Sequence, residues 1–261
     1  MRTGSLLALG MFFATLATGC AAVTPSATTS TIVEQVPLVD GERYVYELST
    51  LAGEVIGSGE LSTRIEGTRF VLEQRYEGVP IDGRAAPTDV TELAVDATSF
   101  APFGALREAT LEGDDGLPEV DLYDWSYAAG DEDDGDELTV VRTSDGDQDT
   151  DQLRLRTNYY DNESSLWLWR TIDFDEELDV NYVSVNPIQQ TQQTVNIRTP
   201  AVETVEVPAG TFEAWRLIVR NGRAIRSAWI NAAPPHQILQ WDNGDVVFRL
   251  TEFEVPEPSG G

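Results

Sequence analysis

Hydrophobic and polar residues alternate with a period of two over most of this chain, which is the pattern of half-buried β-strands. In RYVYELST (43–50), Tyr44, Tyr46 and Leu48 fall on one face. Similar runs recur about every ten residues, separated by Gly- and Pro-rich turns. They are RFVLEQRYEG (69–78), TDVTELAVDA (88–97), EVDLYDWSYA (119–128), DELTVVRTS (136–144), DQLRLRTNYY (151–160), LDVNYVSVN (178–186), QTVNIRT (193–199) and VETVEV (202–207). We therefore expect an all-β protein with one or two short helices, built on a strongly curved, half-barrel-like antiparallel sheet.

The C-terminal third has the clearest alternation, and Asn243-Gly244 is typical of a two-residue hairpin turn. Three tryptophans from successive strands are predicted to face one concave side. The candidate ligand-binding residues there are Trp215, Trp229, Trp241, Leu217, Leu239 and Phe248. Four arginines are assigned to the opposite face, where we expect them to pair with carboxylates: Arg216, Arg220, Arg226 and Arg249.

Two segments interrupt the strand pattern. In VPAGTF (207–212), Pro208 cannot donate to a strand ladder and Gly210 tolerates positive φ, which indicates a turn with no chemical role. In DNESSLWLWRTIDFDEE (161–177), Ser164 or Asn162 is suited to capping a helix, although LWLWR also alternates like a strand. We expect a short helix that packs over the sheet.

The N-terminus has the layout of a secretory signal, with one positive charge, a short apolar run and small residues before Cys20. The stretch LATGC resembles the bacterial lipoprotein signal, in which the cysteine is lipidated, and the alternative is an ordinary signal peptide. Several acyl chains would hold the protein on a membrane of the cell envelope. The expected organisation is a signal peptide (1–19), a lipidated Cys20 with a flexible tether (20–37), one β domain (38–256) and a disordered tail (257–261).

The composition narrows the function classes. The chain has 17 basic residues, all of them arginine, against 45 acidic ones, for a net charge of −28. This charge repels nucleic acid and anionic lipid headgroups, so we expect no nucleic-acid partner and an anchor made by lipid. The absence of lysine excludes Schiff-base chemistry and a P-loop. The single cysteine excludes an intrachain disulfide.

Three kinds of site chemistry come into question. One is a calcium loop, because acidic residues alternate as its ligands do at Asp145, Asp147, Asp149 and Asp151. However, the positions of the required Gly and Glu are occupied by Thr150 and Arg156. A solvated acidic hairpin is therefore the preferred interpretation. His236 is the sole histidine and has no nucleophile motif beside it. A pair of carboxylates for hydrolysis stays open, because 45 acidic residues guarantee some close pairs. We expect no cofactor.

Several stretches carry a resemblance to a known family: DGERYVYEL and GEVIGSGEL near the start, SSLWLWRTIDF in the middle, and VEVPAGTFEAWRLIV, AWINAAPPHQILQW and VVFRL near the end. Their order resembles a family of uncharacterised bacterial envelope proteins, a domain of unknown function related to the half-barrel that carries lipoproteins and lipids across the periplasm. The resemblance implies a curved sheet whose concave face is covered by short helices or loops and holds acyl chains. It supplies no catalytic residues.

The sequence thus predicts a non-catalytic envelope lipoprotein that binds a hydrophobic acyl or lipid ligand in a concave sheet. Two alternatives remain: a structural or protein-interaction lipoprotein with a filled tryptophan core, and a carboxylate-based hydrolase. A hollow lined by the tryptophans favours the first function. Two carboxyls that face each other across a cleft favour the hydrolase.

Overall fold

Fifteen strands join edge to edge into one sheet in the part of the chain that the computed structural model describes, residues 32–79, 86–112, 117–130, 135–174 and 178–257. The first half of the sheet contains β1 (Arg43–Thr50), β2 (Val55–Glu66), β3 (Arg69–Gly78), β4 (Thr88–Asp96), β5 (Pro102–Glu112), β6 (Pro118–Ala128), β7 (Glu137–Ser144) and β8 (Asp147–Arg154). The second half contains β9 (Tyr159–Asp161), β10 (Asp179–Asn186), β11 (Thr191–Val207), β12 (Gly210–Asn221), β13 (Ala224–Asn231), β14 (Ile238–Asp242) and β15 (Val246–Glu254).

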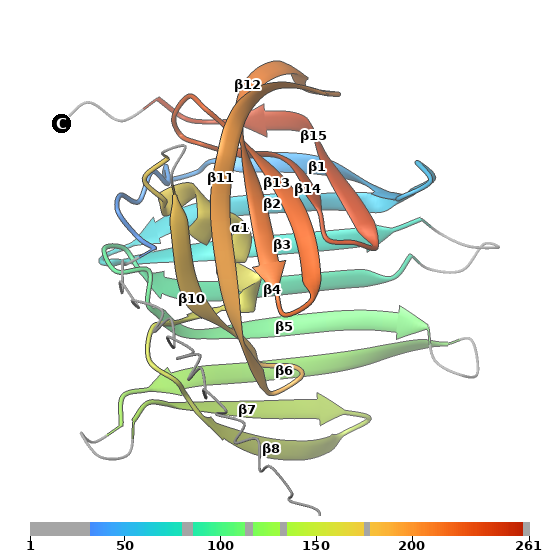
Figure 1. Cartoon of the computed structure of the whole chain (residues 1–261). Coiled ribbons are helices and arrows are strands. Elements are labelled where there is room, and N and C mark those ends of the chain that lie inside the picture. The colour runs from blue at the N-terminus through green and yellow to red at the C-terminus, as the bar shows by residue number, and fades with distance from the viewer. Residues whose placement is uncertain (1–31, 80–85, 113–116, 131–134, 175–177, 258–261) are drawn as a thin grey trace, which may run out of the picture.

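The strand order follows the chain on each side of one long-range junction. It runs from β8 down to β1, then from β15 down to β9, so β1 pairs with β15 in the middle of the sheet. Neighbouring strands are antiparallel, except for the short parallel pair of β9 and β10. The sheet curves so strongly that the second half lies over the first (Figure 1). The expected curved, unclosed antiparallel sheet is confirmed.

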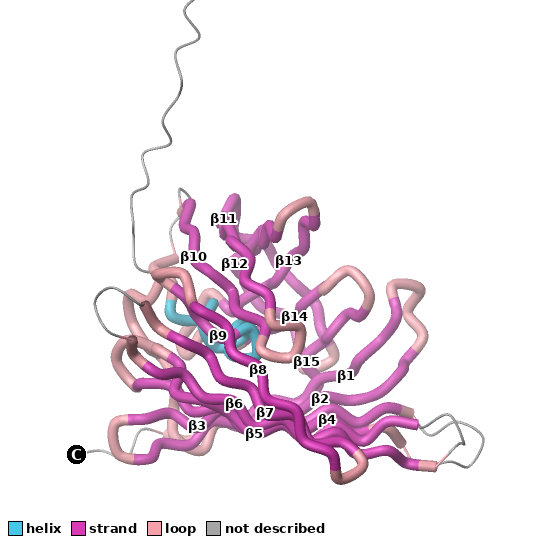
Figure 2. Tube along the Cα trace, turned by 90° about the horizontal axis from the view of Figure 1, so that it is seen from below, coloured by secondary structure: helices cyan, strands magenta, loops and turns pink. Residues whose placement is uncertain are grey.

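A short helical segment lies in the concavity between the two halves of the sheet (Figure 2). It consists of η1 (Asn162–Ser164), α1 (Ser165–Leu168) and η2 (Trp169–Thr171), which confirms the expected short helix. Its first turn is capped by the Asp161 side chain, which accepts a hydrogen bond from the Glu163 backbone N–H, and not by Asn162 or Ser164. Trp167, Leu168 and Trp169 are buried, so the segment fills much of the space that the curved sheet encloses.

The expected turn at VPAGTF is confirmed, because β11 ends at Val207 and β12 begins at Gly210. The prediction of two strands over 193–207 is wrong. β11 is one long strand with a register shift between Arg198 and Ala201. Pro200 falls within this shift. Because proline has no N–H to donate, it is tolerated within a sheet at a bulge.

The packed part of the protein begins earlier than the predicted boundary at Leu38. Ile32 is buried in the core, and the backbone N–H groups of Glu34 and Gln35 donate to the Thr171 carbonyl at 2.9 and 3.2 Å. The last part of the predicted tether therefore packs against the end of the helical segment. Cys20 lies outside the described residues. No helix in the described ranges has the length and apolar character needed to cross a membrane.

Candidate functional site

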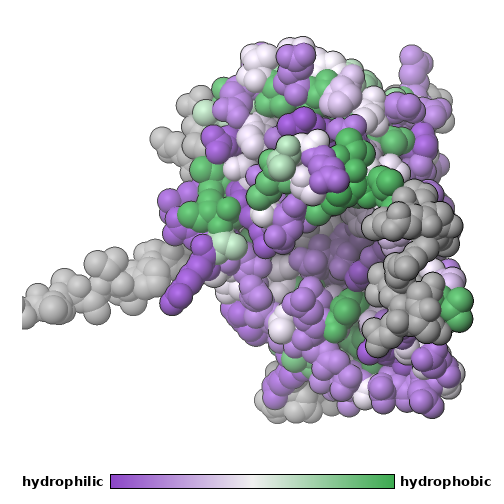
Figure 3. All heavy atoms as spheres, turned by 90° about the vertical axis from the view of Figure 1, so that its right-hand side faces the viewer, coloured by the Kyte–Doolittle hydropathy of each residue, from purple (hydrophilic) through white to green (hydrophobic). Residues whose placement is uncertain are grey.

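A hollow of about 270 Å³ lies between the two halves of the sheet, beside the helical segment. One wall comes from β3, β14 and β15, the opposite wall from β10 to β13, and the inner end from η1 and α1. Figure 3 faces the side that is on the right in Figure 1, and shows the molecule hollowed there between two lobes, with hydrophilic side chains in its depth.

Aromatic side chains form one wall of the hollow. Trp241 and Phe248 are cross-strand partners on β14 and β15, so they lie side by side on the inner face. The Trp169 ring meets Trp241 edge-on with centroids 4.7 Å apart, and Tyr76 meets Phe248 in the same way at 5.7 Å. These contacts fix the rings as a preformed apolar surface.

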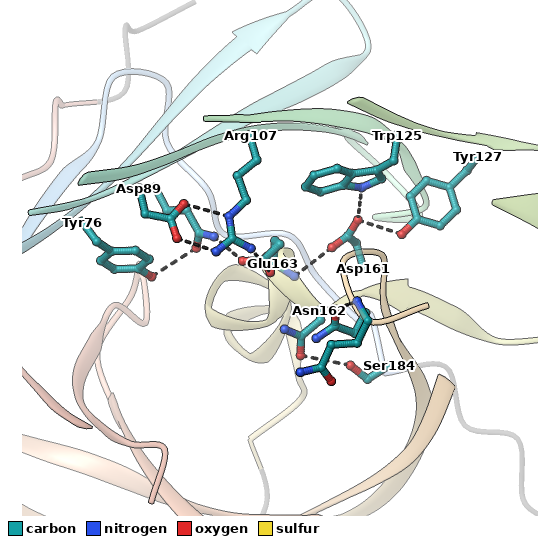
Figure 4. Close-up of polar contacts among 12 residues, drawn as sticks. Tyr76, Asp89, Arg107, Trp125, Tyr127, Asp161, Asn162, Glu163 and Ser184 are labelled. Carbon is teal, nitrogen blue, oxygen red and sulfur yellow. Dashed lines mark hydrogen bonds and ion pairs between the residues drawn. The ribbon is translucent and has the colours of Figure 1, made fainter. Parts of the chain in front are cut away.

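The inner end of the hollow is polar and is organised around Glu163. Its carboxylate accepts a hydrogen bond from the Gln74 side-chain amide and lies 3.7 Å from the Arg107 guanidinium (Figure 4). The Tyr76 hydroxyl donates to Gln74 Oε1 at 3.2 Å. Burial is the largest influence on Glu163 and raises the pKa of its carboxyl above the ordinary value. Asp89 anchors Arg107 from the other side, with Nε donating at 2.9 Å.

A second carboxylate, Asp161, lies close by but is fully enclosed and does not line the hollow. It accepts hydrogen bonds from Trp125 Nε1 and the Tyr127 hydroxyl, both at 2.7 Å, and from the Glu163 backbone N–H at 2.8 Å (Figure 4). Burial first, and then the charge of Glu163, raise the pKa of Asp161 to about 7. Asp161 thus ties the start of the helical segment to β6.

The lining of the hollow does not bring two carboxyl groups face to face among the described residues. Among the described residues that line the hollow, Glu163 is the one carboxylate, and no histidine or cysteine accompanies it. The partner that a two-carboxylate mechanism needs, Asp161, is saturated by donors and shielded from the hollow. His236 lies elsewhere, with Nδ1 3.0 Å from the Asn231 carbonyl oxygen and its ring tilted against Phe174.

The structure separates the predicted ligand-binding residues. Trp241 and Phe248 line the hollow, whereas Leu217 and Leu239 are fully enclosed in the core. Trp215 lies on the inner face but stacks on Phe174 in another pocket of about 320 Å³, which His236 and Arg170 also line.

The predicted orientation of Trp229 is wrong. Its cross-strand partners are Arg216 and Gln240, so it lies on the outer face, where its indole N–H donates to Glu203 and Arg216 lies over its ring. The interior beside it is already filled: Ala228, on the opposite face of the same strand, is fully buried next to Trp241.

The assignment of Arg226 to the outer face is also wrong. It is the cross-strand partner of Val219 and lines the hollow. No ion pair joins Arg216, Arg220, Arg226 or Arg249 to a carboxylate among the described residues, so the expected pairing is not seen for any of the four.

Sequence reasoning missed the polar residues of the hollow: Gln74, Asn162, Glu163, Ser184, Asn221 and Asn243. The alternation of β3 contained part of the signal, because Gln74 and Tyr76 share a face with Phe70 and Leu72. A polar side chain on the inner face of a strand needs a partner when it is buried, and here the partner comes from the helical segment.

The calcium alternative is not supported. Asp147, Asp149 and Asp151 lie along the extended strand β8, and Asp145 lies in the preceding turn, so they do not curl around one point. The described part of the chain has no group of three or more His, Cys, Asp or Glu that is arranged to hold a metal ion. Residues 131–134 of the other acidic run lie outside the described residues.

A larger depression of about 670 Å³ lies on the outer face of β4 to β8. Its cross-strand rows mix the two kinds of side chain: Glu108 separates Val90 from Leu122, and Leu106 separates Glu92 from Asp124. Because each apolar side chain is flanked by a carboxylate, this surface does not form the continuous apolar wall that the inner hollow has.

The comparisons with known proteins identify the family. The sequence profile described as "Protein of unknown function (DUF3108)" matches residues 45–251, which confirms the expected family of unknown function. None of the curated proteins matches the chain.

One solved structure supports the fold, and it supports the fold alone. A β-barrel-like protein of the domain of unknown function DUF1849 from Brucella abortus is 10% identical, with a TM-score of 0.55, over 85% of this chain and 100% of that one. A presumed exported protein with a YmcC-like fold from Bacteroides fragilis is 11% identical over 85% and 99% of the two chains, with a TM-score of 0.32. A presumed lipoprotein from Parabacteroides distasonis is 9% identical over 84% and 97%, with a TM-score of 0.31.

Proposed function

This chain belongs to the DUF3108 family of proteins of unknown function, and we propose that it is an envelope protein that binds a hydrophobic ligand without catalysis. The expected lipid on Cys20 would hold it on a membrane, facing the periplasm or the exterior. The observation that carries the proposal is the hollow inside the curved sheet, with its aromatic wall of Trp241 and Phe248.

The size of the hollow limits the ligand. Its 270 Å³ correspond to roughly nine water molecules at about 30 Å³ each. This is slightly below the usual range of small-molecule pockets. The space suits one alkyl chain or one small molecule, and not the several chains of a complete lipid anchor. The buried side chains of the helical segment occupy the interior beside the hollow.

The composition of the walls supports binding of the apolar part of the ligand against the rings. Removal of apolar surface from water contributes roughly 25 cal/mol per Å². Because Trp169, Tyr76, Trp241 and Phe248 already contact one another, the site costs little reorganisation when the ligand enters. The donors around Glu163 and Asp161 keep both carboxylates occupied, which supports a binding role over a hydrolytic one.

The test compares two tryptophans of neighbouring strands on opposite faces of the sheet. Residues 21–261, which contain the whole described fold, would be exported through another signal and analysed by native mass spectrometry and solvent extraction. We expect a stoichiometric apolar adduct in the wild type and in Trp229→Ala, and its loss in Trp241→Ala. Phe248→Asp, at a half-buried wall position, provides a second variant if Trp241→Ala does not fold.

A folded wild type with a clean apo mass that also ignores added alkyl compounds would contradict the proposal. The structural or protein-interaction alternative would then take its place, and a search for a protein partner would follow.

A further inference from the structure

Arg226 is an inner-face arginine without a carboxylate partner among the described residues. Three other arginines that point into the curved sheet each have one: Arg107 with Asp89 at 2.9 Å, Arg142 with Asp121 at 2.9 Å, and Arg170 with Glu42 at 2.7 Å. With 45 acidic residues in the chain, a carboxylate partner is easily supplied. The lack of one at a half-buried position of the hollow therefore calls for an explanation.

The side chains around Arg226 leave hydrogen-bonding capacity unused. Asn221 also lines the hollow. Its Oδ1 atom is a buried acceptor without a partner, and its side-chain N–H groups donate to no acceptor among the described residues. Asn243 lines the same part, where β14 turns into β15. Its Oδ1 atom accepts from the backbone N–H groups of Asp245 and Val246, so among the described residues only its side-chain N–H groups are unused. The one carboxylate on the lining, Glu163, is already held by Gln74 and Arg107, so its charge is compensated without Arg226.

The adjacent part of the lining is apolar. Trp241, two residues before Asn243 on the inner face, begins the aromatic wall that continues through Phe248 and Trp169. The hollow thus combines one uncompensated guanidinium and two amides with a surface for hydrocarbon. Partial burial makes an unpaired cation unfavourable, and a planar guanidinium binds carboxylate or phosphate oxygens through two parallel hydrogen bonds.

We infer that the ligand is a single-chain amphiphile with an anionic oxygen head group, which accepts hydrogen bonds from Arg226 and from the side-chain N–H groups of Asn221 and Asn243, while its chain lies against Trp241 and Phe248. The inference rests on the proposed function and names its ligand class. A carboxylate head and a phosphate monoester head share the required chemistry. The volume of about 270 Å³ limits the apolar part to one chain.

The experiment titrates residues 21–261 with four probes that share a dodecyl chain: dodecanoate, dodecyl phosphate, dodecanol and dodecyltrimethylammonium. Calorimetry and tryptophan fluorescence report binding below the micellar concentration. A charged hydrogen bond contributes about 1.5–3 kcal/mol, so we expect at least one anionic probe to bind about tenfold or more tightly than dodecanol. Comparison of the two anions distinguishes a fatty-acid source from a phosphate-ester source.

Arg226→Gln should lower the affinity for the preferred anion to that of dodecanol and leave dodecanol binding unchanged. Arg220→Gln is the matched control, because Arg220 lies on the outer face of the adjacent strand, and should bind like the wild type. Arg226→Lys should retain part of the preference, since the charge remains but the planar fork is lost.

The inference is overturned if wild type binds dodecanol as tightly as both anions, or if Arg226→Gln keeps the anion preference. Either outcome leaves the proposed binding of a hydrophobic ligand intact, because dodecanol still binds. If a folded protein binds none of the four probes, both the inference and the proposed function fail.

Discussion

Two of the arginines inside the curved sheet have different surroundings, Arg170 at one end of the helical segment and Arg226 beside the hollow. Arg170 is 2% exposed and donates to both oxygens of Glu42 at 2.7 and 2.8 Å. Arg226 is only half-buried and has no carboxylate partner among the described residues. An arginine side chain is therefore neutralised within the fold at position 170, whereas at position 226 it has no carboxylate partner among the described residues.

The Arg170 cluster supplies its own partners. Glu42 also accepts from the Tyr44 hydroxyl at 2.8 Å and the Thr63 hydroxyl at 3.0 Å, and Arg170 donates to the Pro235 carbonyl. A buried ion pair is retained only when its remaining hydrogen-bonding groups are satisfied in this way. The hydrogen-bonding groups of this ion pair are thus used within the fold, so we assign the pair a role in stability.

The largest expected effect comes from breaking the closed cluster. Glu42→Gln removes the charge opposite Arg170 and leaves a buried cation uncompensated, so the free energy of unfolding should fall by about 3–5 kcal/mol. Urea unfolding followed by circular dichroism measures the change. The double variant Glu42→Leu/Arg170→Met should lose less unfolding free energy than the sum of the losses in Glu42→Leu and Arg170→Met. Additive losses would show that the pair acts through something other than mutual charge compensation.

The next effect concerns Asp161 and its dependence on pH. The folded pKa of about 7 lies above an unfolded value of about 3.9. The folded state therefore binds more protons between these values, and this contribution to stability is full below about pH 4 and is lost as pH rises through 7. Its size is on the order of 4 kcal/mol.

The measurement is the difference in unfolding free energy between wild type and Asp161→Asn from pH 5 to 8, where wild type should lose stability relative to the variant. The readout is the slope with pH, since the Asp161→Asn substitution also changes the hydrogen bonds to Trp125 and Tyr127. Parallel curves would mean that Asp161 stays ionised at pH 5, held in that form by its three donors.

Substitution of Arg226 should change the stability of the ligand-free protein least. Arg226→Gln removes a cation that has no ion pair, so without ligand its unfolding free energy should stay within about 0.5 kcal/mol of wild type. Arg170→Gln should destabilise by several times that amount, because it leaves Glu42 buried and unpaired. A large loss in the ligand-free Arg226→Gln protein would place Arg226 in the structure instead of the binding site.

The local pattern of apolar residues was sufficient to locate most strands, but it assigned the two faces of β13 wrongly. In RAIRSAWIN, both parities carry apolar residues, and the larger ones, Ile225 and Trp229, suggest the inner face. The structure turns them outward and buries Ala228 and Ile230, because Trp241 and the helical segment already occupy the interior there. The misplacement of Arg226 follows from the same ambiguity, since its parity is that of Ala228.

The polar contacts inside the sheet were harder to predict than the strands, because they join residues that are far apart in the sequence. Gln74 and Glu163 are 89 positions apart, and their hydrogen bond exists only because the helical segment packs on β3. Tyr46 and the Ile238 carbonyl, which bond at 3.0 Å, are 192 positions apart. Nothing in either local pattern specifies such a partner.

Four features follow from the amino-acid sequence without the structure: the all-β class, the turn at Pro208, the short helical segment and the exclusion of chemistry that needs lysine or paired cysteines. These follow from alternation, backbone preference and composition, which are local or global sums over the chain. Three other features depend on the folded chain: β1 pairs with β15, the helical segment lies in the concavity, and Arg226 faces a hollow. Alternation assigns residues to two faces of a strand, but what covers each face depends on packing between distant segments.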